Sequence, residues 1–296
     1  MQFAVISVCL VVTVVAVSLF VRTITQFVRT MKLGQPADRS DQPGARTATL
    51  VREFLGHTRM ARLPWVAVAH WFTMISFGVL FLTLVNAFGQ LFDPDFVLPL
   101  IGHFPPYEWL TEFLAWTGFF GILLLMLVRQ KNHPRSQHRR SRFFGSSFWQ
   151  AYYVEFTILG VVICILILRG LEYARLAGQG EAYAGVLHFP LTFFLGEAFS
   201  GMSQSALGTA ILLVAGLKIL ISFAWMITIS LTPTMGVAWH RFLAFFNIWF
   251  KRHPDGRTSL GELQPIMVNG QALDFENIDE LDEDAPMGVA QVEHFT

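Results

Sequence analysis

Cysteine is almost absent from this sequence of 296 residues, which contains only Cys9 and Cys164. The two stand far apart, and the sequence has no C-x-x-C motif. Cysteine-ligated iron–sulfur clusters and thiolate zinc sites need several cysteines at close spacing, so this chain alone cannot hold one. Both cysteines lie in apolar runs, which predicts that they act as small buried apolar side chains.

Charged residues are also scarce, at 14% of the chain, against roughly a quarter in an average soluble domain. Hydrophobic residues make up 53%, phenylalanine occurs 29 times, and the mean hydropathy is +0.50. This composition predicts an integral membrane protein in a lipid bilayer. The formal net charge is zero, and we expect no nucleic-acid partner.

The apolar runs predict an all-α protein. About 20 apolar residues cross the hydrocarbon core of a bilayer as one helix. Five stretches are long enough, at about 2–21, 64–88, 109–128, 148–168 and 207–231. We therefore expect a bundle of five transmembrane helices.

Two apolar segments need separate interpretation. The first run has no basic residue before its apolar core, and Arg22 and Arg29 follow it, so we expect a retained span rather than a signal peptide. A sixth patch, at 186–202, is shorter and contains Pro190 and Glu197. We expect it to be an interfacial or re-entrant piece.

The charges of the loops predict the orientation. Residues 22–62 contain eight Lys/Arg and three acids, and residues 129–142 contain six Lys/Arg and no acid. Both should be cytoplasmic by the positive-inside rule. Residues 89–106 have no Lys or Arg, and 169–206 have two Arg against three Glu. These two segments should face outward. We therefore expect a protein of the plasma membrane, with its N-terminus outside the cell and its C-terminus in the cytoplasm.

The sequence changes character near its C-terminal end. Residues 1–251 form the predicted membrane domain, which closes with an interfacial helix at about 236–250. Residues 252–296 contain the acidic stretch "DFENIDELDEDAP", which is typical of a solvated segment. We expect a cytoplasmic linker towards a further part of a longer polypeptide, of which this chain is the membrane portion.

Two histidines share a depth in the predicted bundle. His70 lies inside the second span, about 9 Å beyond Pro64 at 1.5 Å per residue. His240 follows the fifth span, just after Pro233, and is also on the cytoplasmic side. Neutral imidazoles on two helices at one depth suit the two axial positions of one haem b iron.

Other residues near this pair fit the same interpretation. Arg62 and Arg241 could pair with the haem propionates, because guanidinium groups bind carboxylates in a bidentate manner. Gly78 leaves room for the macrocycle. His57 is a rival ligand, which would suit a haem nearer the surface. The alternative for His70 is a hydrogen bond to a neighbouring helix, without a cofactor.

Two of the charged residues inside the predicted spans need an interpretation. Glu155 lies seven residues into the fourth span, and Lys218 lies near the middle of the fifth. One interpretation is a polar lining that handles a quinone and its protons. The other is a structural pair, or a lysine that extends to the membrane surface.

Several stretches resemble known redox proteins of membranes. The layout, with one histidine early in span two and another beyond span five, resembles the gamma (cytochrome b) subunit of respiratory nitrate reductase and the membrane portions of heterodisulfide-reductase-like proteins. "VAHWFTMISFGVLFLTL", "RRSRFFGSSFWQAYYVEFTILG", "KILISFAWMITISLTPTMGVAWHRF" and "NIWFKR" resemble more closely the N-terminal half of the actinobacterial membrane-bound iron–sulfur reductase. That family is similar to electron-transfer-flavoprotein:menaquinone oxidoreductases, and the resemblance covers most of residues 60–296.

The resemblance implies the membrane part of an oxidoreductase, with no catalytic residue of its own. Electron-transfer flavoprotein would feed cytoplasmic 4Fe-4S clusters, and electrons would pass through the membrane domain to menaquinone. His70 and His240 match the ligands of the cluster-facing haem. The positions for a second haem are Leu80 and Ser222 by spacing. Neither is a histidine, so the resemblance implies one haem.

Two other functions compete with electron transfer. The chain could be a cofactor-free anchor for a cytoplasmic reductase. It could also transport an ion or a proton past Glu155 and Lys218. Transporters often contain internal repeats with matching broken spans, and this sequence has neither, which makes the transporter the weaker alternative.

Overall fold

The computed structural model describes residues 1–32, 35–37, 39–138, 148–257, 266–268, 271–277, 287–288 and 293–295. The chain divides into two compact units. The first consists of Met1–Val21 and Arg59–Arg241, and the second consists of Arg22–Thr58 and Phe242–Thr296. The first unit contains the predicted spans and both histidines of the predicted pair.

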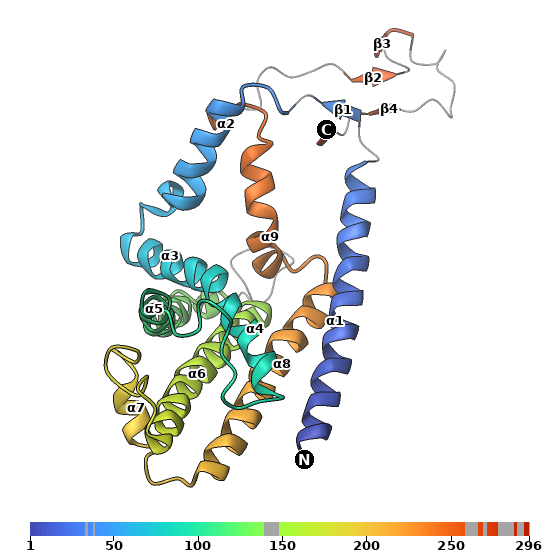
Figure 1. Ribbon diagram of the computed structural model, residues 1–296. Coiled ribbons are helices and arrows are strands. Elements are labelled where there is room, and N and C mark those ends of the chain that lie inside the picture. The colour runs from blue at the N-terminus through green and yellow to red at the C-terminus, as the bar shows by residue number, and fades with distance from the viewer. Residues whose placement is uncertain are drawn as a thin grey trace. The chain divides into compact units, whose positions relative to one another are not determined.

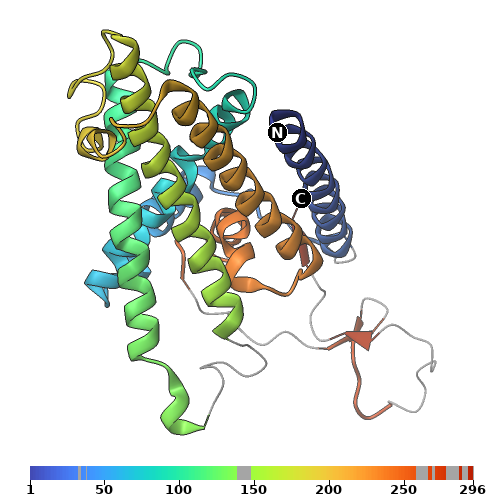
Figure 2. The same cartoon turned by 90° about the horizontal axis from the view of Figure 1, so that it is seen from below.

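Helices form the first unit, and α1 and α9 continue from it into the second (Figures 1 and 2). Their bounds are α1 (Gln2–Met31), α3 (Pro64–Val79), α4 (Phe81–Gln90), α5 (Pro105–Lys131), α6 (Phe148–Gln179), α7 (Phe193–Glu197), α8 (Gln204–Leu231) and α9 (Gly236–Trp249), with a 3-10 turn, η3 (Pro134–Gln137).

Four of these helices, α1, α5, α6 and α8, are long and apolar enough to cross a membrane. α3 and α4 pass the same test together, as one span bent by 42°. The described residues therefore provide four spans, or five when the bent pair is counted as one. The prediction of an all-α membrane protein is confirmed at this level.

The second predicted span, at 64–88, is not one straight helix. It breaks at Leu80, where the amide of Thr83 donates to the carbonyl oxygen of Leu80 at 3.0 Å and the Thr83 hydroxyl donates to it at 2.6 Å. α3 packs against α5, whereas α4 packs against α8. The bend, visible in Figure 1, therefore lets one span contact two different helices.

Small residues bring α3 and α5 close together. A Cβ atom added to Gly121 would lie 3.0 Å from the carbonyl oxygen of Ala69, and one added to Gly118 would lie 3.1 Å from the hydroxyl of Ser76. Ser76 donates a hydrogen bond of 2.9 Å to the carbonyl oxygen of Leu114 across this contact. Glycine at the helix interface allows close backbone approach, as is common in membrane helices.

Apolar side chains fill the space between α1, α4, α6 and α8. Cys9 is fully buried there, and its thiol lies 3.7 Å from the carbonyl oxygen of Gly216. Cys164 is also buried, and both cysteines are free thiols. The prediction that they are buried apolar fillers is confirmed. The buried members of this cluster include Leu91, Leu168, Leu171, Leu207, Ile211, Ala215 and Ile219.

Two helices extend well beyond the predicted apolar runs. α5 occupies Pro105–Lys131 rather than 109–128, and α6 occupies Phe148–Gln179 rather than 148–168. The added turns carry charged residues, which the hydropathy pattern had placed in loops. In the segment 186–202 only the five-residue helix α7 forms, between turns, as expected for a short non-spanning piece.

The second unit contains short elements. They are α2 (Pro43–Leu50), a π-helical turn η1 (Val51–Leu55), a 3-10 turn η2 (Thr58–Met60) at its boundary, and strands β1 (Gln35–Ala37), β2 (Met267–Val268), β3 (Gln271–Ala272), β4 (Met287–Gly288) and β5 (Glu293–Phe295). β1 pairs with β5 in parallel, and β2 lies between β3 and β4 with antiparallel pairing.

A buried arginine holds the second unit together. Arg46 is 1% exposed and donates to the carbonyl oxygens of Trp249 and Lys251, at 2.9 and 2.7 Å, and it also pairs with Asp41. Lys251 pairs with Glu53. Most of the predicted acidic linker, within 252–296, lies outside the described residues.

Candidate functional site

The two histidines of the predicted pair lie next to each other. His70 is in the second turn of α3, and His240 is in the second turn of α9. Their ring centroids are 6.0 Å apart, and the rings are tilted by 37°. The structure therefore brings together, from two helices, the two imidazoles that the sequence placed at one depth.

The start of α9 is fixed by Trp239, which precedes His240. The indole nitrogen of Trp239 donates to the carbonyl oxygen of Ile229 on α8 at 3.1 Å, and its ring stacks on Phe20 of α1 at 5.6 Å. Trp239 is 1% exposed. Because a neighbour of His240 is locked in this way, the position of the imidazole follows from the packing of the bundle.

Arg241 lies beside the pair, between two aromatic rings. Its guanidinium carbon is 4.8 Å from the ring centroid of Phe77 and 4.6 Å from that of Trp225. Its Nε–H is buried without a hydrogen-bond acceptor in the described part of the chain. Burial lowers the pKa of Arg241 to about 10, so the group is a cation at neutral pH. His240 is exposed, but desolvation by the surrounding protein, followed by the charge of Arg241, lowers its pKa.

The other predicted residues near the pair have different positions. A Cβ atom added to Gly78 would meet nothing within 4 Å, so the space beside it is open. Arg62 is exposed in the turn before α3. His57 belongs to the second unit, where its Nδ1 lies 2.8 Å from the carbonyl oxygen of Phe54.

Glu155 and Lys218 do not pair with each other. Glu155 on α6 accepts a hydrogen bond of 2.7 Å from Arg129 on α5. Lys218 on α8 is 1% exposed and donates to the carbonyl and hydroxyl oxygens of Thr83, each at 2.7 Å. Lys218 therefore does not extend to the surface, and the two residues that were predicted together have separate environments.

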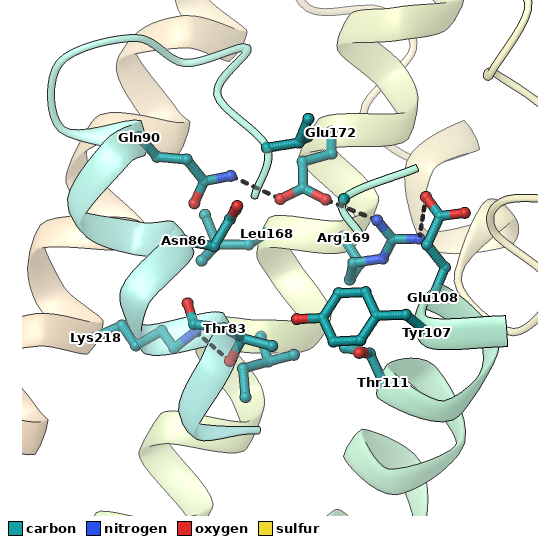
Figure 3. A pocket seen from close by; sticks show the side chains of 13 residues that line it. Thr83, Asn86, Gln90, Tyr107, Glu108, Thr111, Leu168, Arg169, Glu172 and Lys218 are labelled. Carbon is teal, nitrogen blue, oxygen red and sulfur yellow. Dashed lines mark hydrogen bonds and ion pairs between the residues drawn. The ribbon is translucent and has the colours of Figure 1, made fainter. Parts of the chain in front are cut away.

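Lys218 instead lines a polar cavity between α4, α5, α6 and α8 (Figure 3). Figure 3 shows Lys218 and Tyr107 pointing into it from different helices. Arg169 on α6 forms its charged wall, with 3.0 Å contacts to Glu112 and Glu172. The remaining lining includes Asn86, Gln90, Val97, Gly102, Glu108, Thr111, Ile165 and Leu168.

A second histidine contact lies at this cavity. His188 is 8% exposed, and its Nδ1 lies 2.6 Å from Glu108 Oε2. Arg169 donates to the carbonyl oxygen of His188 at 2.5 Å and lies 4.0 Å from the ring centroid of Phe189. Three separate segments of sequence, α5, α6 and the loop at 188–189, therefore meet in one buried charged network.

Sequence reasoning missed this network because it ended the spans too early. Glu108 and Glu112 are four residues apart on α5, and Arg169 and Glu172 are three residues apart on α6. Both spacings place the paired side chains on one helix face. That spacing was the available signal. Only the packing could show that both faces point to the same cavity.

Two loops predicted to face the same side do meet. Arg175 at the end of α6 binds both carboxylate oxygens of Asp95, at 2.5 and 2.6 Å. These hydrogen bonds hold the pKa of Asp95 below its usual range, against the opposing effect of burial. His103 stacks on Tyr183 with centroids 4.0 Å apart, and burial, followed by the charge of His188, lowers the pKa of His103.

No group of three or more His, Cys, Asp or Glu side chains that could hold a metal ion exists among the described residues. A haem iron does not require such a group, because the porphyrin supplies four ligands and the protein supplies two. Searches with this chain found no matching family model, no matching curated protein and no matching solved structure.

Proposed function

We propose that this chain is a membrane electron-transfer module that binds one haem b between His70 and His240. The separation of the two rings carries the proposal. Two metal–imidazole bonds of about 2 Å on opposite sides of one metal, with about 1 Å from each nitrogen to its ring centre, give centroids about 6 Å apart. The observed separation is 6.0 Å, so the residues fit the group.

The neighbours of the pair fit the same cofactor. Arg241 is a half-buried cation whose buried Nε–H is unsatisfied among the described residues, which suits a propionate carboxylate. Phe77 and Trp225 hold the guanidinium by cation–π contact and provide apolar walls. The open space beside Gly78 leaves room for a flat ring. Arg62, at the surface, is a second candidate for a propionate.

Haem b, when bound, supplies a one-electron carrier whose potential depends on its axial ligands and on nearby charge. The protein's contribution is to fix the ligands and that charge. α3 presents His70 and α9 presents His240, while Arg241 adds a positive charge in a site of low polarity. Ligands on helices are positioned better than ligands on loops.

We place this module between cytoplasmic iron–sulfur clusters, loaded by electron-transfer flavoprotein, and menaquinone in the plasma membrane. This placement is supported by the resemblance of the quoted stretches to the actinobacterial membrane-bound iron–sulfur reductase. The chain has only two cysteines, too few for iron–sulfur clusters of its own, so the clusters would lie outside it. The loop charges support an outer N-terminus and a cytoplasmic C-terminus. Of the two residues proposed for a quinone and proton path, Lys218 faces a cavity and Glu155 is held by Arg129.

Absorbance spectroscopy tests the haem. The full chain, expressed in haem-replete cells and purified in detergent, should show reduced-minus-oxidised Soret and alpha bands. His70→Ala and His240→Ala should each abolish or strongly reduce these bands, while circular dichroism shows the helices retained. His133→Ala, which replaces a histidine stacked on Phe148, should leave the spectrum unchanged.

The same series separates the alternatives. Loss of the bands in His57→Ala, with the bands retained in His70→Ala, would assign the ligand to the rival histidine. A colourless, folded wild-type protein would reject the haem and leave the cofactor-free anchor. Ion flux into liposomes from that colourless protein would favour the transporter.

A further inference from the structure

The polar cavity reaches from one end of the bundle to the middle of a long apolar helix. Glu108 lies in the first turn of α5. Lys218 lies near the centre of the 28-residue helix α8, about 20 Å from either end at 1.5 Å per residue. Both line the same cavity (Figure 3). The cavity therefore connects the loop end of the bundle with a buried amine at mid-helix.

The buried oxygen atoms at this cavity include two to which no described protein atom donates a hydrogen bond. Gln90 Oε1 and Glu108 Oε1 accept no hydrogen bond in the described part of the chain, and the residues are 1% and 2% exposed. Buried polar atoms are nearly always hydrogen-bonded, and ordered water is the usual partner when the protein supplies none. The cavity walls therefore present acceptors for water.

The cavity is large enough to hold water. The space open to the centre of a water molecule is about 50 Å³. Each water needs about 15 Å³ of such space, so about three waters fit. A short chain of waters can therefore fill the cavity.

The charges around the cavity balance when one additional proton is bound. Three ionised carboxylates, on Glu108, Glu112 and Glu172, are balanced by only two cations, the guanidinium of Arg169 and the ammonium form of Lys218. One negative charge is therefore left over. Uncompensated charge is costly in a membrane protein interior. One proton on the Glu108–His188 contact, at 2.6 Å, neutralises the cluster.

The other groups that face this contact do not supply the missing proton. Arg169 approaches Glu108 Oε1 only to 3.8 Å, and His103 approaches it to 3.9 Å. Glu172 is already bonded by Gln90 at 2.7 Å, and Glu112 is bonded by the amide of Leu191 and the hydroxyl of Thr192 at 2.7 and 2.5 Å. Glu108 is thus the carboxylate with an oxygen left for a proton.

We propose that the cavity and the Glu108–His188 contact form a hydrated proton-transfer site between the loop end of the bundle and Lys218. The N–H bond of a protonated His188 Nδ1 breaks as an O–H bond forms on Glu108. When Lys218 is the amine rather than the ammonium counted above, this O–H bond on Glu108 breaks as a cavity water takes the proton. An O–H bond of the last water then breaks as an N–H bond forms on Lys218. Only protons move, so no oxidant, reductant or haem is required.

Infrared spectroscopy of the full chain in lipid nanodiscs tests this site, whether or not haem is bound. As the pH is lowered, wild-type protein should develop a carboxylic-acid C=O band, and this band should shift within the mixing time on transfer to D₂O. Glu108→Gln should remove the band. Glu155→Gln is the matched control, since Glu155 is 4% exposed and lies away from the cavity, and the band should survive it.

A second variant covers the case in which Glu108→Gln does not fold. His188→Gln removes the imidazole that shares the proton, so the band should appear at higher pH than in the wild type. A band that survives Glu108→Gln, or that is unmoved by His188→Gln, overturns the assignment. Deuterium exchange as slow as that of interior amides would overturn the hydrated path.

Discussion

Lys218 Nζ donates to both the carbonyl oxygen and the hydroxyl oxygen of Thr83, and each hydrogen bond is 2.7 Å long. These bonds join the middle of α8 to the helix break that follows Leu80. A fully buried ammonium group is thus stabilised largely by one threonine, at the position where the second span changes direction.

Thr83→Val should lower the free energy of unfolding by about 2 kcal/mol, because it removes a hydrogen bond to a buried charged group. The double variant Thr83→Val/Lys218→Met should recover much of this loss, since replacing a buried charge by an apolar side chain also removes its desolvation cost. Thermal midpoints from tryptophan fluorescence in detergent measure both. Thr83→Ser, which keeps the hydroxyl, should stay near wild type, and equal losses in the single and double variants would contradict this account.

The pair formed by Arg129 and Glu155 should respond asymmetrically. Arg129 has a side chain 31% exposed, whereas that of Glu155 is 6% exposed. After Glu155→Leu, the arginine can reach water along its flexible stem. After Arg129→Met, the carboxylate stays buried and loses its partner, which should cost about 2–3 kcal/mol. We therefore expect a larger drop in thermal midpoint for Arg129→Met than for Glu155→Leu, and the reverse order would rule out the buried pair.

Arg241→Gln tests the proposed haem environment by its potential. A positive charge near the iron favours the reduced state, so its removal should lower the midpoint potential by tens of millivolts, measured by redox titration of the alpha band. Arg241→Lys should retain most of the wild-type potential. Arg62→Gln is the comparison at an exposed arginine, and it should have a smaller effect. An unchanged or higher potential in Arg241→Gln would show that the guanidinium does not act on the iron.

Asp95 should make stability fall at acidic pH. Its pKa is lowered in the folded protein by the hydrogen bonds from Arg175, so its contribution is fully present above the unfolded value of about 3.9. This contribution is lost as the pH falls through the lowered folded value. The contact is partly exposed, with the Asp95 side chain 38% exposed, and should contribute at most about 1 kcal/mol.

Thermal midpoints between pH 2 and 6 should therefore fall more steeply for the wild type than for Asp95→Asn. Glu181→Gln, at an exposed acid in the next loop, should follow the wild-type curve. Parallel curves for the wild type and Asp95→Asn would show that the contact with Arg175 has no effect on stability.

Apolar length was enough to locate the helices of the first unit, because a membrane helix must be apolar over a fixed distance. It could not show the break at Leu80, which depends on Lys218 reaching a carbonyl oxygen 135 positions earlier in the chain. Depth along the helices also brought His70 and His240 together, since depth follows directly from counting residues.

The charged network around Arg169 could not be predicted from apolar length or from depth along the helices. Glu108 and His188 belong to segments 80 residues apart. His188 was predicted in an outward-facing segment, whereas Glu108 lies just before the third predicted span. Charged side chains can extend a helix past its apolar part when a partner neutralises them. Whether a partner exists depends on tertiary packing, which hydropathy does not contain.

The close contact between α3 and α5 has a mechanical consequence for the histidine pair. The carbonyl oxygen of Ala69, the residue before His70, lies 3.0 Å from the position that a Cβ atom on Gly121 would take. Gly121 has no side chain, so no rotamer change of this residue can absorb a displacement of α5 towards α3. Such a displacement is therefore passed directly to the main chain that carries His70.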